Sequence, residues 1–301
     1  MIGGETMHLK KKFRFVTLLI LSSLIMTNIT WGRTYSGKMT FGARSLALGG
    51  CSIGDKDNIG VLYSNPSALG LMNGDAIVSW SYNNKFGIKN FSEEQMAIVF
   101  RKWGPVRVGF AKIDNDASLY EVAGSNFWQD HRTIMGLGIE ISPSFAVGAS
   151  WQKVSLSLDV DNNQLTQDNN LLNIGLLYNY KNFSTGISIS DIEILNEDKQ
   201  FSRSYHLGIS YKKGLFGYML EYSYLDTPAS TEKSGFVSLG VEADLAPGFA
   251  LRLGGNNLRS GKLPNISIGI GASFKNISLD YAYIAPYLVN SSHQISTTYF
   301  F

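Results

Sequence analysis

Few side chains in this sequence of 301 residues have the type and spacing that chemistry requires. Asp159, Asp161 and Asn163 have the spacing that opens a calcium-binding loop, in which carboxylate and amide oxygens hold the ion. That loop also needs a glycine and a closing glutamate, but Gln164 and Asn170 stand at those positions instead. The spacing therefore favours a solvated polar loop over a calcium site.

Nucleophilic catalysis would need a serine, a histidine and a carboxylate or amide that point at one another. His131, His206 and His293 lie far apart in the sequence, and no serine motif accompanies them. We therefore expect no enzyme activity, no metal and no cofactor. His206 lies on the glycine- and serine-rich face of a predicted strand. Six charged residues share such faces and could tune passage or pair with one another: Arg107, Glu140, Glu221, Glu242, Arg252 and Asp280.

The overall charge and the single cysteine exclude further classes of protein. The formal net charge is +2 at pH 7, so electrostatics give no support to a nucleic-acid partner. Cys51 cannot form a disulfide within the chain, so the fold must be stable without one. Residues 48–51 resemble a lipidation motif, but they lie far behind the apolar N-terminal run. We interpret Cys51 as a small packed residue.

The N-terminal residues have the pattern of an export signal. Basic residues at positions 10–14 precede an apolar run over 15–26, which is too short to span a bilayer. Thr30 and Gly32 would be the residues at positions −3 and −1 of a cleavage site. We therefore predict a signal peptide over 1–32, with a short membrane anchor as the alternative.

From residue 74 to the end, segments alternate an apolar side chain with a small or polar one. In the segment ISIGIGASF, Ile266, Ile268 and Ile270 share one face, whereas Gly269 and Gly271 lie on the other. A period of two predicts strands that have one face in an apolar medium. The predicted strands, about fourteen in number, centre near residues 79, 98, 109, 137, 150, 175, 187, 207, 220, 239, 251, 269, 280 and 297.

The connections between the predicted strands alternate in length. Short turns rich in glycine, proline, asparagine and lysine alternate with longer polar segments such as residues 114–130 and 158–170. This alternation is typical of outer-membrane barrels, because only a closed sheet satisfies its backbone hydrogen bonds in lipid. The sequence predicts an antiparallel transmembrane β-barrel over 74–301 in a Gram-negative-type outer membrane. A soluble β-sandwich or propeller is the alternative.

Residues 33–73 do not alternate cleanly and are rich in glycine and alanine. Asn65 and Pro66 predict a helix start, since asparagine caps helices and proline suits their first position. Gly49 and Gly50 permit a tight bend or a close approach of backbone. A fourteen-strand barrel is wide enough to hold this segment, so we predict a plug with a helical turn inside the lumen. An ordinary periplasmic extension is the alternative.

The same segment resembles the N-terminal signature of the PorV/PorQ family, which belongs to the FadL-like outer-membrane barrels. The similar residues are Gly-Ala-Arg at 42–44, Ala-Leu-Gly-Gly at 47–50, the acidic Asp55 and Asp57, and Tyr-Ser-Asn-Pro-Ser-Ala-Leu-Gly at 63–70. Cys51 and Ser67 depart from the family pattern. The resemblance implies a plug in a fourteen-strand barrel, with motif residues Arg44, Gly49, Gly50, Asp57, Asn65 and Pro66.

Two functions follow from this resemblance. The first is an accessory or docking role in type IX protein secretion, with secretion-system components or secreted C-terminal domains as partners. The second is a channel for uptake of hydrophobic small molecules. The other expected partners are outer-membrane lipid and the outer-membrane assembly machinery. For that machinery, the terminal aromatic Phe301 on an alternating strand would be the signal.

Overall fold

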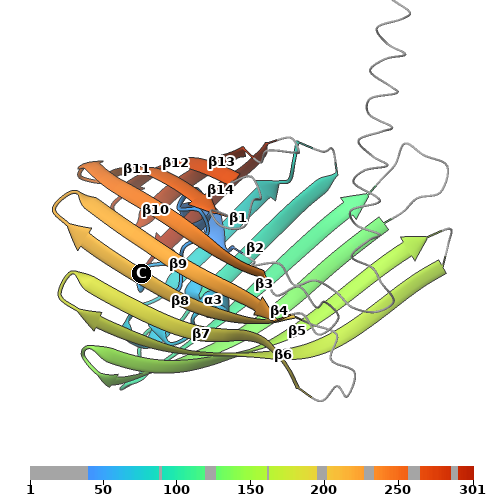
Figure 1. Ribbon diagram of the computed structural model, residues 1–301, viewed down its shortest axis with the longest axis horizontal. Helices are drawn as coiled ribbons and strands as arrows, with labels where there is room; N and C mark the ends of the chain where they lie inside the picture. The colour runs from blue at the N-terminus through green and yellow to red at the C-terminus, as the bar shows by residue number, and fades with distance from the viewer. Residues whose placement is uncertain are drawn as a thin grey trace, which may run out of the picture.

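The computed structural model describes residues 40–87, 90–118, 127–160, 163–194, 202–226, 234–256, 265–285 and 291–301. Within these ranges the chain forms fourteen antiparallel strands that close into one barrel, and β1 is hydrogen-bonded to both β2 and β14 (Figure 1). The predicted all-β barrel of about fourteen strands is confirmed. The signal peptide predicted over 1–32 lies outside the described residues, as do residues 33–39 of the predicted plug.

Every predicted strand centre falls inside a strand of the barrel. In chain order, the strands are β1 Ile77–Asn84, β2 Phe91–Val99, β3 Val106–Ser118, β4 Phe127–Ser142, β5 Phe145–Val160, β6 Asn163–Tyr180, β7 Phe183–Ile194, β8 Arg203–Lys213, β9 Phe216–Asp226, β10 Ser234–Ala246, β11 Phe249–Asn256, β12 Asn265–Phe274, β13 Ile277–Ala285 and β14 Ser292–Phe300. In the described part of the chain, short helices precede them: α2 Gly42–Ala47, α3 Val61–Ser64 and α4 Ala68–Leu71. Of the helices described, none is long and apolar enough to cross a membrane.

The two faces of each strand have different surroundings, as the alternation predicts. On β12, Ile268 is 52% exposed on the outside of the barrel, whereas Ser267 and Gly269 are buried on the lumen side. The same arrangement holds on β9, where Leu220 points outward and Glu221 inward. An apolar outer surface suits acyl chains, and small inner residues leave room in the lumen.

Strands β3–β6 are longer than predicted. They contain 13, 16, 16 and 18 residues, more than the nine to eleven or so that span a bilayer. Most of residues 114–130 and 158–170 lies in these strands, so the prediction of long loops there was wrong. Figure 1 shows these strands extending beyond their neighbours at the rim opposite the short turns.

The polarity of the two faces of β5 inverts beyond Trp151, which explains the wrong prediction. Lys153 faces outward and pairs with Asp168 of β6 at 3.3 Å, whereas Val154 and Leu156 are buried on the inside. An outer face that has left the bilayer meets water, so its side chains become polar while the backbone ladder continues. In sequence, this polar outer face looks like a loop.

Both ends of the barrel meet at the rim of short turns. Ile77 at the start of β1 lies opposite Phe300 at the end of β14, and the backbone nitrogen of Phe301 donates to the carbonyl of Ala76 at 2.9 Å. The ring of Phe301 contacts Tyr299 edge-on, with 4.7 Å between centroids. Its role as an assembly signal remains a prediction.

A lysine on the lipid-facing surface tests the orientation of the strands. Ile268→Lys is expected to lower the free energy of unfolding in lipid vesicles by about 2–4 kcal/mol, because it places a charge near the bilayer midplane. Ser157→Lys, on the outer face of β5 beyond Trp151, is the matched control and is expected to change stability little. Equal destabilisation by both variants would contradict the inverted polarity. Urea titrations followed by heat-modifiable gel mobility would measure both.

Candidate functional site

Residues 41–72, here called the plug, lie inside the barrel (blue and light blue in Figure 1). Helix α2 contacts strands β11–β14, and helix α4 contacts β3–β5 on another side of the lumen. Ala43, Ala47, Leu62 and Leu69 are each at most 1% exposed. The plug therefore buries its apolar side chains against the inner face of the barrel.

Inward-facing glycines let the main chain of the plug touch the barrel wall. A side-chain carbon on Gly254 of β11 would lie 2.0 Å from the backbone nitrogen of Gly49. One on Gly148 of β5 would lie 2.4 Å from the backbone nitrogen of Ser67. Similar approaches of less than 3.0 Å to plug backbone or to the Asn65 amide occur at Gly138, Gly175, Gly186, Gly208 and Gly240. Only glycine allows contacts this close, so these positions fix how near the plug lies to the wall.

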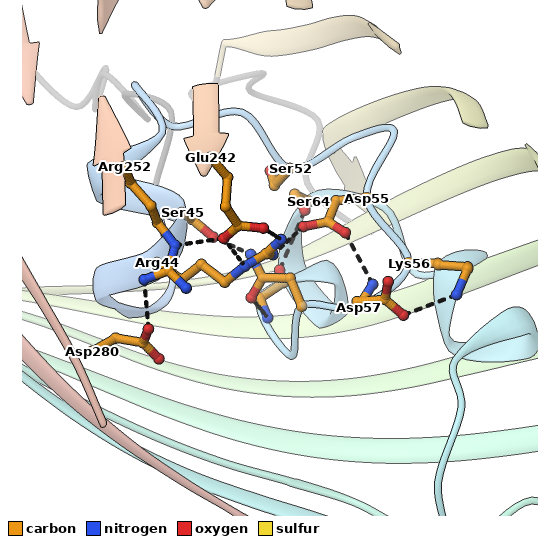
Figure 2. Close-up of polar contacts among 12 residues, drawn as sticks. Arg44, Ser45, Ser52, Asp55, Lys56, Asp57, Ser64, Glu242, Arg252 and Asp280 are labelled. Carbon is orange, nitrogen blue, oxygen red and sulfur yellow. Dashed lines mark hydrogen bonds and ion pairs between the residues drawn. The ribbon is translucent and has the colours of Figure 1, made fainter. Parts of the chain in front are cut away.

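A cluster of charged side chains joins α2 to the barrel (Figure 2). The Arg44 guanidinium donates from Nε and Nη2 to the two carboxylate oxygens of Glu242, each at 3.1 Å, and also pairs with Asp55. Arg252 donates to Glu242 at 2.6 Å and to Asp280 at 2.6 Å. The cluster links the plug to strands β10, β11 and β13, and its two cations face three carboxylates.

The environment of Arg44 keeps it charged. Burial lowers the pKa of Arg44, but the negative charges of Asp55 and Glu242 outweigh burial and raise that pKa well above its ordinary value. The bidentate geometry with Glu242 is the strong form of this ion pair. Arg44 is therefore a fixed positive charge at the centre of the attachment.

Barrel side chains also accept hydrogen bonds from the plug's main chain. Glu221 Oε2 accepts from the backbone nitrogens of Ser52 and Ile53 at 3.0 and 3.3 Å. Gln95 Oε1 accepts from the nitrogen of Gly42 at 2.8 Å. These contacts satisfy buried backbone groups of an irregular segment, which would otherwise be costly. The sequence shows that Glu221 faces the lumen, but no local signal identifies its partners.

The structure brings together most of the residues that the N-terminal motif singled out. Arg44 lies in the charged cluster, and Gly49, Asn65 and Pro66 all contact the wall. Gly49 and Gly50 have φ of +68° and +81°, so the chain turns there in the left-handed region after α2.

Asp57 lies apart from this group. Its side chain is 59% exposed and pairs with Lys56, whereas Asp55 is the carboxylate that reaches Arg44. The two aspartates are two residues apart, and the sequence alone does not distinguish them.

The predicted helix cap at Asn65 was wrong. Helix α4 begins at Ala68 and has no side-chain cap. The Asn65 amide nitrogen instead donates to the carbonyls of Ile53 and Leu176 at 2.8 and 3.2 Å. Asn65 thus joins two parts of the plug to strand β6.

Ser223, His206 and Glu221 lie together on the lumen wall, but not as a catalytic relay. His206 Nδ1 is 2.8 Å from Ser223 Oγ, and Ser223 Oγ donates to Glu221 at 3.2 Å. A relay places the histidine between the serine and the acid, with a different ring nitrogen toward each. Among the described residues, no group of histidine, cysteine and acidic side chains is arranged to hold a metal ion.

On the loop side of the plug, the lumen wall carries an apolar patch. Val154, Leu156 and Leu171 of β5 and β6 form a buried cluster on the inner face. In the strand register, Val154 lies opposite Arg132 and Leu171 opposite Gln152. Arg132 Nη1 and Gln152 Oε1 are buried without a hydrogen-bond partner. This part of the wall therefore combines buried apolar side chains with buried polar atoms that have no partner.

A methyl group at a contact glycine is expected to displace the plug. Gly254→Ala should destabilise the folded barrel by about 1–3 kcal/mol, because rigid backbone surrounds the new carbon. It should also speed trypsin cleavage in the plug. Gly136→Ala is the matched control: its new carbon would meet the side-chain ends of Leu62 and Leu69 at 2.7 and 3.3 Å, which can move. Equal cleavage rates in both variants would contradict the role of Gly254.

Loss of the Arg44 guanidinium is expected to weaken the attachment of α2. Arg44→Gln should lower the free energy of unfolding by about 3 kcal/mol, since it leaves the buried Asp55 without its ion-pair partner and Glu242 with Arg252 alone. Adding Asp55→Asn should restore part of that loss. Lys56→Gln, which breaks the exposed pair with Asp57, is the control and should leave the urea midpoint unchanged. A midpoint shift as large in Lys56→Gln as in Arg44→Gln would show that burial is not the cause.

Comparison with solved structures identifies similar barrels. The toluene transporter TbuX of Ralstonia pickettii has a TM-score of 0.71 at 13% identity, over 87% of this chain and 98% of that chain. The monoaromatic hydrocarbon channel CymD has a TM-score of 0.68 at 14% identity, over 87% and 98% of the two chains. A Pseudomonas aeruginosa FadL homologue has a TM-score of 0.65 at 10% identity, over 87% and 99%.

Comparison of the sequence with protein families also identifies an outer-membrane barrel. No curated protein matches the chain in sequence. The family model described as Gram-negative porin matches residues 21–283, which include the plug, strands β1–β12 and most of β13. Proteins of this kind lie in the outer membrane. The chain therefore belongs to the Gram-negative porin family and has the fold of the FadL-like barrels.

Proposed function

We propose that this barrel passes hydrophobic small molecules across the outer membrane and that the plug controls their passage. The observation that carries the proposal is the apolar patch of Val154, Leu156 and Leu171 on the inner wall. A channel for polar solutes has a polar lumen, so an apolar inner surface near the loop rim favours apolar solutes. Two structural relatives are a toluene transporter and a monoaromatic hydrocarbon channel, which is consistent with this class of solute.

Passage requires the plug to move or to be bypassed. The contacts at Gly148, Gly240 and Gly254 leave no space between plug backbone and wall at those points. The attachment through Arg44 and Glu242 is polar, and the atoms it joins could exchange partners with water. Because Val154 and Leu171 are buried, an apolar solute would reach the patch only when the segments that cover it move, and it would proceed when the plug shifts.

Uptake of radiolabelled toluene by porin-deficient cells that carry the full chain tests this proposal. We expect faster uptake than in cells without the protein and a loss of about fivefold in Val154→Asn, since a buried amide makes the patch unfavourable for an apolar solute. Ser155→Asn, the adjacent outward-facing position, is the matched control and should keep full uptake. Uptake no faster than in cells that lack the protein would refute the proposal.

The second candidate is the accessory or docking role in type IX secretion. It is supported by the resemblance of residues 42–70 to the PorV/PorQ signature and by the close packing of those residues in the lumen. A docking component needs no open lumen. The two functions differ in their readout: a secretion role predicts that deletion of the protein abolishes surface display of secreted C-terminal domains and leaves toluene uptake unchanged.

A further inference from the structure

Two lysines lie side by side on the outer surface of the barrel, at the rim of short turns. The backbone nitrogen of Lys212 in β8 donates to the carbonyl of Asn182, the residue before β7, at 2.9 Å. One step nearer the rim, the antiparallel register therefore places Lys181 beside Lys213. Side chains alternate between the two faces of a strand, so Lys213 points outward as Tyr211 does.

The ammonium group of Lys181 also lies on the outer surface. It is 5.2 Å from the centroid of the Tyr180 ring, and Tyr180 is 52% exposed. The ion pairs of the described residues include neither Lys181 nor Lys213. Lys212, on the lumen face of β8, instead pairs with Asp244 at 2.8 Å. Two like charges are therefore neighbours on the outside, where an anion would offset their repulsion.

A row of aromatic side chains lies next to the two lysines, on the bilayer side. Phe183, Tyr211 and Tyr218 are neighbours across β7, β8 and β9, and they are 38%, 40% and 48% exposed on the outer face. Phe216, opposite Lys213, stacks on Tyr218 with 6.4 Å between ring centroids. Aromatic rings at strand ends lie at the membrane interface, where headgroups meet acyl chains. The lysines therefore lie at the depth of the headgroups.

We propose that this surface binds an anionic phospholipid of the periplasmic leaflet. The short turns of an outer-membrane barrel face the periplasm, so the lysines meet the headgroups of that leaflet. The lipid phosphate would lie between Lys181 and Lys213, and the acyl chains would pack along the aromatic row. Two ammonium groups favour a headgroup with a net negative charge over a zwitterionic one, whose own cation they repel. The site goes beyond the proposed function, because it lies outside the barrel and requires no movement of the plug.

Native mass spectrometry of the protein, purified from outer membranes and titrated with lipid in detergent, tests the site. The probes are dioleoyl phosphatidylglycerol and dioleoyl phosphatidylcholine, which have the same acyl chains. We expect the first phosphatidylglycerol to bind about tenfold or more tightly than the first phosphatidylcholine. Equal affinity for the two lipids would overturn the proposal. Displacement of phosphatidylglycerol by an equal concentration of inorganic phosphate would also overturn it, since the site would then hold free phosphate instead of lipid.

Substitutions assign the binding to this pair of lysines. Lys213→Gln should weaken binding of the first phosphatidylglycerol about fivefold, whereas Lys213→Arg, which keeps the charge, should retain it. Lys181→Gln combined with Lys213→Gln should bind the two lipids equally. Lys212→Gln is the matched control, because Lys212 is adjacent but paired on the lumen face. Equal weakening in Lys212→Gln and Lys213→Gln would show that overall charge attracts the lipid, and would overturn the site.

A second control lies at another short turn. Lys275 is 5.4 Å from the centroid of the Phe274 ring, in the turn between β12 and β13, which holds a single lysine. Lys275→Gln should leave phosphatidylglycerol binding unchanged, and a loss as large as in Lys213→Gln would overturn the role of the pair. The substituted lysines are exposed, so these variants should fold, as heat-modifiable mobility on gels would verify.

Discussion

The strands of this protein must find all their backbone hydrogen-bond partners within one sheet, because acyl chains provide none. The seam between β1 and β14 meets this requirement with eight residue pairs, from Ile77 opposite Phe300 to Asn84 opposite His293. Once the sheet is closed, its outer face is committed to apolar side chains and its inner face surrounds a lumen. Most other features of the structure concern how that lumen is filled.

The lumen is filled by the chain's own N-terminal segment, and glycine on the wall is the condition for it. A glycine weakens a strand for two reasons: it loses more conformational entropy on folding than other residues do, and it has no side chain to pack. At Gly148, Gly240 and Gly254 the absent side chain is replaced by plug backbone. Polar side chains then secure the segment, with Arg44 and Glu221 as the main points of attachment. The wall and the plug are complementary surfaces of a single fold.

Much of this architecture follows from the sequence, because a period of two reports directly on the two faces of a strand. All fourteen strands and the inward orientation of Arg252, Glu242 and Asp280 follow from it. The lengths of β3–β6 do not follow from this period. Their outer faces become polar where the strands leave the bilayer, and in sequence such a segment looks like a loop.

The contacts of the plug also could not be predicted from local sequence patterns. Choosing Asp55 over Asp57 as the partner of Arg44 requires the position of β10 relative to the plug. The partners of Asn65 are separated from it by 12 and 111 positions in sequence. Such long-range pairings come from topology rather than from neighbouring residues.

The packing of α2 against β11–β14 joins the first described helix of the chain to its last strands. Contacts between segments so distant in sequence carry a large loop-closure entropy, which slows their formation. Until the last strands are in place, α2 has no complete surface on which to dock. Docking of the plug therefore depends on the same strands that close the seam of the barrel.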